Sequence, residues 1–383
     1  MVTAAQPFSA DPAGAVRLAR SPRTTRDRAV AAVRHLGPNW YASVMGTAIV
    51  ATAGAGLPVQ VPGLRTACAV VWALSLMMLV TLLVARAAHW RYHPDQARAH
   101  LLDPATAPFY GCLAMALLAV GGGTLVVGAD WIGTGAAVAV DTVLFTAGTA
   151  LGLAAAVAVP YLMVVHHRIE PGQASPVWLL PLVAPMVSAA LGPLLVPHLP
   201  AGRPRETLLL GCVALFGLSL LAVLMMLPMV FARLVTSGPP PLVLTPTLFL
   251  VLGPLGQSTT AAGKFADVAP GALSAPYAHG FAFFAVLYGV PVMGFALLWL
   301  ALAVALVVRA RRRGMGFAMT WWAFTFPLGT CATGAESLAR HTGAAAFDIL
   351  AVALYALLVA AWSVAAVGTA RGLISGRLLA APR

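Results

Sequence analysis

Charged residues are scarce in this chain. Asp, Glu, Lys and Arg make up 9% of its 383 residues, hydrophobic residues make up 60%, and the mean hydropathy is +0.89. A soluble globular domain carries about 25% charged residues, and 9% could not cover so much apolar surface with water-facing groups. The composition therefore excludes an ordinary soluble protein and predicts a polytopic integral membrane protein.

Cysteine is rare as well. The four cysteines (Cys68, Cys112, Cys212 and Cys331) are scattered through apolar stretches. Their spacing fits neither a disulfide framework nor a metal site, so we interpret them as packing residues. The sequence predicts no metal and no cofactor.

Patterns typical of enzymes and of nucleic-acid-binding proteins are missing. The chain has no nucleophile motif, no phosphate-binding glycine loop, and no set of four histidines at matched depth for two haems. Its nine histidines lie near the ends of apolar stretches, and we expect His89 and His93 to form a solvated turn. The basic residues are dispersed without interleaved aromatics, which argues against nucleic acid. A membrane-embedded enzyme or redox subunit remains only as an alternative.

Ten stretches are long and apolar enough to cross a bilayer, which requires roughly 20 residues. They are separated by short segments that hold most of the charge. We predict an all-α fold with spans at about 38–56, 65–86, 106–127, 133–165, 175–196, 206–232, 246–263, 278–308, 317–338 and 347–370.

The positions of the basic residues predict the orientation. With ten spans, 18 of the 23 Lys and Arg residues fall on the side that holds both termini, which is therefore cytoplasmic. We expect a mostly disordered basic tail over 1–36, which lacks the apolar core of a signal peptide, a transmembrane domain over 37–375, and a cytosolic tail over 376–383. The net charge of +12 suits anionic lipid headgroups, and we expect a multi-pass plasma-membrane protein.

The odd-numbered stretches differ from the even-numbered ones. The odd ones are short and rich in glycine and proline; examples are the Gly121–Gly123 run and Pro185. Proline inside a helix frees a carbonyl that lipid cannot satisfy. We therefore expect the odd helices to form an inner ring and the even helices an outer shell, as five helical hairpins around an axis. Glycine and proline are also common in any membrane helix.

Few ionisable groups lie inside the predicted spans. Asp141 lies in the fourth and either pairs with a neighbour or stays protonated. Five charged residues lie at the outer ends of the seventh, ninth and tenth stretches: Lys264, Asp267, Glu336, Arg340 and Asp348. They form either an external mouth, for which Lys264, Glu336 and Arg340 are the candidates, or solvated helix ends. Gly148 and Gly152 have a GxxxG spacing that allows close approach of another outer helix or another subunit.

Three sequence strings carry a family resemblance: NWYASVMGTAIV at 39–50, GPLGQS at 253–258 and WWAFTFPLGT at 321–330. In this order, on the first, seventh and ninth stretches, they resemble the tellurite-resistance/dicarboxylate transporter family. That family includes TehA-like proteins and slow anion channels, and the GPLGQ string is more similar to its sulfite-exporter and malate-permease branch. The resemblance covers nearly all of residues 37–375.

The resemblance implies a homotrimer in which the odd helices of each subunit line a pore. It also implies that a phenylalanine on the ninth helix closes that pore, and the motif places it at Phe326. Phe324 is the competitor, but two residues along a helix turn by roughly 200°, so both cannot point inward. The other pore-lining candidates are Gly46, Thr47, Gly253, Pro254, Gly256, Gln257, Ser258, Thr325 and Pro327.

The function predicted from this resemblance is membrane transport of a small anion, sulfite or a C4-dicarboxylate such as malate, with tellurite resistance as a family label. An anion pore requires partial positive charge without a trap that binds too tightly. Helix N-termini, hydroxyls and amides can supply it. A proton-coupled carrier of the same anions is the alternative mechanism.

Overall fold

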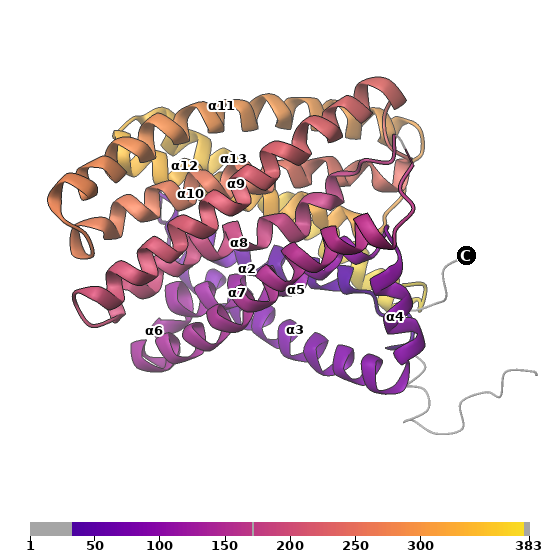
Figure 1. The fold of residues 1–383 in the computed structure, drawn as a ribbon, viewed down its shortest axis with the longest axis horizontal. Coiled ribbons are helices and arrows are strands. Elements are labelled where there is room, and N and C mark those ends of the chain that lie inside the picture. Colours follow the sequence, from indigo (N-terminus) through magenta and orange to yellow (C-terminus); the bar gives the residue numbers. More distant parts are fainter. Residues whose placement is uncertain (1–32, 171, 379–383) are drawn as a thin grey trace, which may run out of the picture.

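The computed structural model describes residues 33–170 and 172–378. The basic tail predicted over 1–36 lies almost entirely outside the described residues, as do the last five residues of the chain. Within the described ranges the secondary structure is entirely helical (Figure 1). The prediction of an all-helical chain is confirmed.

Eight helices of the described part are long and apolar enough to cross a membrane. Each overlaps one of the predicted stretches. They are Leu64–Tyr92, Ala107–Ile132, Thr134–Val165, Pro176–His198, Arg203–Ser237, Leu242–Gly271, Ala275–Arg312 and Ala345–Ile374. The other two predicted stretches also form helices, α2 (Tyr41–Gly56) and α12 (Thr325–Thr342).

Burial alternates along the chain. In the spans that contain α5 (Tyr110–Gly123), α8 (Leu179–Leu191) and α10 (Leu252–Val268), 78–89% of the most apolar window is buried. In α3 (Leu64–Tyr92), α7 (Thr134–Val165), α9 (Arg203–Ser237), α11 (Ala275–Arg312) and α13 (Ala345–Ile374) the share is 17–28%. Most residues of α2 and α12 are also buried. Of these ten helices in the described part of the chain, five are therefore inside and five outside.

The inner helices contact one another in a closed cycle. α2 packs on α5, α5 on α8, α8 on α10, α10 on α12, and α12 on α2 again. Each inner helix also packs on the long outer helix that follows it in the chain. In Figure 1, α2 and α8 lie in the middle of the molecule, with α11 along one edge and α3 along the opposite one.

Every inner helix begins with a 3₁₀ segment. These segments are η1 (Pro38–Trp40), η2 (Ala107–Phe109), η4 (Pro176–Trp178), η6 (Leu242–Val251) and η8 (Met319–Phe324). Pro181, Pro254 and Pro327 are each the third residue of the α-helix that follows. Proline is tolerated in the first turn, where its missing N–H removes no helical hydrogen bond. Pro181 and Pro254 therefore lie inside apolar spans, as expected, at the point where the 3₁₀ segment passes into the α-helix. Pro185 lies inside α8 itself.

Two expectations about polar and small residues need correction. Gly148 packs on Leu118 of α5 and Gly152 on Ala184 of α8, so this GxxxG spacing serves contacts between outer and inner helices of one chain. His89 is fully buried and is not part of a solvated turn. Its Nδ1 lies 2.9 Å from the Val33 carbonyl, and its ring stacks on that of His100 at 5.3 Å.

Asp141 is buried against the inner helix α5. Its carboxylate lies at Gly121, where any larger residue would collide with it. The side chain of Asp141 is 2% exposed, and its Oδ2 has no hydrogen-bond partner in the structure. The pairing with a neighbouring side chain that we considered is therefore not formed among the described residues.

Candidate functional site

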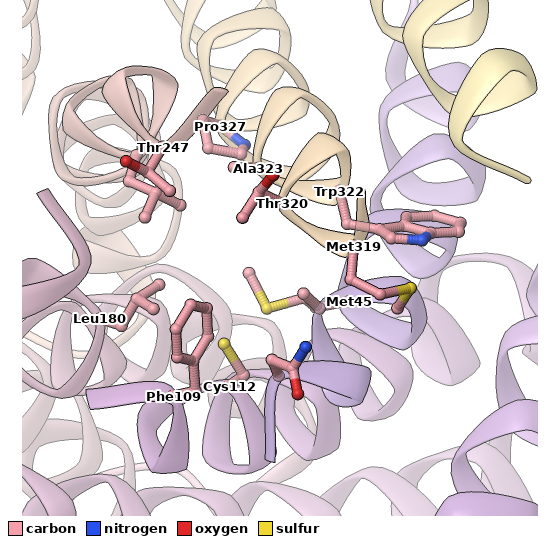
Figure 2. A pocket seen from close by; sticks show the side chains of 13 residues that line it. Met45, Phe109, Cys112, Leu180, Thr247, Met319, Thr320, Trp322, Ala323 and Pro327 are labelled. Atoms are coloured by element: carbon pink, nitrogen blue, oxygen red, sulfur yellow. The ribbon is translucent and has the colours of Figure 1, made fainter. Parts of the chain in front are cut away.

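A small cavity lies where the five inner helices begin. Its volume is about 30 Å³, and a cavity needs roughly 10–15 Å³ to hold one water molecule. All five inner segments contribute side chains to its wall (Figure 2). The lining residues are Asn39, Ala42, Met45, Phe109, Cys112, Leu180, Thr247, Leu250, Met319, Thr320, Trp322, Ala323 and Pro327.

The same end of the molecule gathers the N-termini of the inner helices. Each inner helix is followed by an outer helix that packs against it and returns to the side where the inner helix began. The five inner helices therefore run in the same direction. Helix N-termini carry partial positive charge and unpaired N–H groups, which favour anions. The cavity in Figure 2 therefore lies at an end of the ring where an anion is favoured over a cation.

The contacts of α12 identify the face that it turns to the centre of the ring. Thr325 and Gly329 meet α2, whereas Thr330 and Gly334 meet α10. Successive helical residues turn by about 100°. Phe326, Thr333 and Arg340, seven residues apart, therefore lie on the face between these two contacts, away from the outer helices α11 and α13.

The inner face of α10 follows from the same argument. Gly256 and Gly263 meet α12, and Thr259 meets α11. Gly253, Gln257 and Lys264 lie on the remaining face. A Cβ built on Gly253 would meet nothing within 4 Å, although the residue is buried. Of the buried glycines in the described part of the chain, this is the one that faces open space.

Gln257 adds an unpaired polar group to this face. The side chain is 3% exposed, and its Oε1 has no hydrogen-bond partner. A buried amide oxygen without a partner costs free energy unless water or a ligand satisfies it. The space beside Gly253 and Gln257 is therefore suited to a hydrated or polar occupant.

Charged side chains gather at the far ends of α10 and α12. Asp267 is shared by three basic groups: Lys264 Nζ at 3.7 Å, Arg340 at 3.6 Å and His341 Nε2 at 3.4 Å. Lys264 and Arg340, with one carboxylate between them, leave an excess of positive charge. This basic cluster (Lys264, Asp267, Arg340 and His341) brings together two of our three mouth candidates.

Glu336, the third mouth candidate, is not a solvated helix end. Its side chain is 5% exposed, and its Oε1 is buried without a hydrogen-bond partner. The carboxylate lies against Gly56 at the end of α2, in a space that a side chain on residue 56 would fill. The charges of Arg340 and Lys264 both act on it.

The two phenylalanines considered as a gate lie in different places. Phe324 packs edge-on against Phe249 at 4.7 Å and against Trp321 at 5.7 Å. It lines a groove on the outside of the ring together with Val304 of α11 and Leu357 of α13. Phe326 is 3% exposed and belongs to the main hydrophobic core.

Several pore-lining candidates lie in contacts between helices. Gly46 packs on Thr325, and Gly256 packs on the backbone of Thr330 and Cys331. The Thr47 hydroxyl donates to the Ser43 carbonyl and accepts from Trp362 of α13. Ser258 donates to the Leu255 carbonyl, Pro327 lines the small cavity, and Pro254 is buried in the first turn of α10.

Sequence reasoning missed Thr333 and His341. A signal for Thr333 was present: it lies seven residues after Phe326 and seven before Arg340, the spacing of one helix face. The approach of His341 to Asp267 required the packing of α10 against α12, which pairs residues more than 70 positions apart.

Comparisons with known proteins agree with this architecture. The family profile SLAC1, voltage-dependent anion channel, matches residues 35–370. The chain is 26% identical over 349 residues to the uncharacterized transporter MJ0576 of Methanocaldococcus jannaschii, covering 90% of this chain and 96% of that protein. It is 27% identical to the sulfite efflux pump SSU1 of Arthroderma otae and to that of Trichophyton rubrum, covering 86% of this chain and 89% of each pump.

The family match spans nearly all of the described helical bundle, and these findings confirm the resemblance drawn from the three sequence strings. The relatives are a transporter and two efflux pumps by name, which agrees with a transport protein and not with an enzyme. The chain is a multi-pass membrane protein that belongs to the SLAC1 family of voltage-dependent anion channels.

Proposed function

We propose that this protein passes small anions along the axis of its inner ring, and that sulfite is its first substrate. The observation that carries the proposal is the closed cycle of five buried, parallel helices with open space beside Gly253 at its centre. The partial positive charge of the helix N-termini at one end and the basic cluster at the other favour anions over cations. The likeness to sulfite efflux pumps supports sulfite; malate is the second choice.

In this proposal, α2 and α12 also cross the plasma membrane, so that ten spans form five hairpins with both termini in the cytoplasm. A closed inner ring supports this arrangement, because α2 and α12 are as enclosed by other helices as α5 and α8 are. We also propose that the protein assembles as a homotrimer with one conduit in each subunit.

Phe326 is the proposed gate of this conduit. Its position on α12 between the contacts to α2 and α10 supports an inward direction, and an aromatic ring at a narrow point forms a hydrophobic constriction. Rotation of the ring would open the path.

The test is sulfite flux into proteoliposomes with wild-type protein and with Phe326→Ala. We expect the variant to raise flux severalfold, because the constriction is removed. Phe324→Ala is the matched control: it truncates a phenylalanine of similar burial that faces the outer helices, and its flux should stay at the wild-type level. Unchanged flux in a folded Phe326→Ala protein would contradict the gate.

A proton-coupled carrier of the same anions is the second candidate function. Asp141 and Glu336 favour it, because each is a buried carboxyl group with one oxygen that has no hydrogen-bond partner. Sulfite flux that requires an imposed proton gradient would identify a carrier, whereas flux down the sulfite gradient alone would identify a channel.

A further inference from the structure

Glu336 has a position that anion passage alone does not explain. It is a buried carboxyl on an inner helix, one turn from Arg340 and beside the basic cluster, yet its Oε1 has no hydrogen-bond partner. A buried ionised carboxylate without a close partner is costly. The site therefore favours a carboxyl that gains and loses a proton over a fixed ion pair.

Each element around Glu336 presents a different group to it. Arg340 acts on it from its own helix and Lys264 from α10. From α2 it meets Gly56, which has no side chain. From α13 comes Tyr355, whose hydroxyl lies with the Cys68 sulfur of α3 against Gly54 and interacts with the Glu336 charge.

The cations near Glu336 make their close ion pairs elsewhere. Lys264 and Arg340 both approach Asp267, within 3.7 Å, as does His341. The one carboxylate of Asp267 against the two basic side chains leaves one excess positive charge in this cluster. An ionised Glu336 cancels that excess, and a protonated Glu336 leaves it free.

We propose that the ionised Glu336 carboxylate competes with the passing anion for the positive charge of the basic cluster, and that protonation of Glu336 removes this competition. This inference rests on the proposed function and adds its regulation. When the carboxyl is protonated, Lys264 and Arg340 are available to a passing anion. When the proton leaves to water, the carboxylate takes the place of the anion and repels it. Proton binding at Glu336 and anion binding at the cations therefore favour each other.

The sign of the pH dependence follows. As the pH rises through the titration of Glu336, the excess positive charge disappears and anion passage falls. A coupling of the usual size between two sites corresponds to a change of about tenfold. His341 also approaches Asp267 in the basic cluster, so its contribution must be separated from that of Glu336.

The experiment compares sulfite flux through wild-type protein and Glu336→Gln in proteoliposomes, at equal pH on both sides. The pH runs from about 5 to about 8, a range in which buried carboxyl groups of proteins can change their charge. Sulfite itself changes charge in this range, but equally for both proteins, so the ratio of variant to wild-type flux isolates the protein. We expect a ratio near one at the acidic end that rises about tenfold at the alkaline end. A ratio that stays constant with pH would overturn the inference.

Two further variants keep the result interpretable. His341→Gln should retain the pH-dependent loss of flux; if that loss disappears, His341 and not Glu336 is responsible, and the inference fails. Lys264→Gln removes one of the two basic groups for which Glu336 and the anion compete. It should lower sulfite flux at acidic pH and flatten the dependence of flux on pH, which tests the inference even if Glu336→Gln does not fold. Wild-type vesicles that carry no more sulfite than protein-free vesicles would instead refute the proposed function.

Discussion

At the scale of single residues, two glycines three positions apart on α10 have opposite environments. A Cβ on Gly253 would meet nothing within 4 Å, whereas a Cβ on Gly256 would collide with the backbone of Thr330 and Cys331. We expect Gly253→Ala either to leave the free energy of unfolding unchanged or to raise it by up to about 1 kcal/mol, because alanine has a higher helix propensity than glycine. Thermal unfolding in detergent measures it.

Gly256→Ala is the matched variant for this comparison. The added methyl group must displace backbone atoms of α12, and overpacking of this kind costs about 1–3 kcal/mol. Equal stability of the two variants would show that the space beside Gly253 is filled in the protein. The larger Gly253→Leu should also lower anion flux, because its side chain would enter the proposed conduit.

At the scale of helices, small residues on α7 decide how the outer layer packs on the inner one. A Cβ on Gly148 would lie 2.7 Å from Leu118 Cγ and 3.1 Å from the Ala114 carbonyl of α5. We therefore expect Gly148→Val to lower the free energy of unfolding by about 1–3 kcal/mol, as measured by thermal unfolding.

The control for this contact is a glycine of another outer helix. Gly294 of α11 is exposed on the outside of the ring, and a Cβ there meets nothing within 4 Å. Gly294→Val should leave the stability within about 0.5 kcal/mol of wild type. If Gly148→Val altered only the oligomeric state and not the stability, the glycine would serve a contact between subunits instead.

At the scale of the whole molecule, a conduit along the ring should admit a small water-soluble reagent. The four native cysteines are buried, each at most 2% exposed, so the wild-type protein should react little with thiol reagents. Thr333 is partly exposed on the inner face of α12, whereas Thr325 is fully buried against α2. We expect Thr333→Cys to react with a small anionic methanethiosulfonate and Thr325→Cys to stay unreacted.

The readout is the mass of the protein after a timed exposure of intact proteoliposomes to the reagent. Equal protection of the two cysteines would indicate a ring that is packed solid at this depth. Reaction of Thr333→Cys that Phe326→Ala accelerates would add that Phe326 limits access along the conduit.

The sequence by itself determined the elements and their layers. Helices occur at all ten predicted stretches, and the contrast between broken and smooth stretches matches the contrast between buried and exposed helices. Both follow from local properties: hydropathy over about 20 residues fixes where a helix can cross lipid, and glycine and proline are tolerated where other helices surround the backbone. Three short strings were enough to indicate the family.

Only the tertiary structure decided which way individual side chains point. The sequence could not show that Glu336 is buried against Gly56, that Thr47 bonds to Trp362, or that Asp267 collects three basic partners. The rotation of each helix about its axis depends on contacts such as Gly256 against Thr330, between residues more than 70 positions apart. Hydropathy is a sum over a segment and is unchanged by that rotation, so the inner face of each helix had to come from packing.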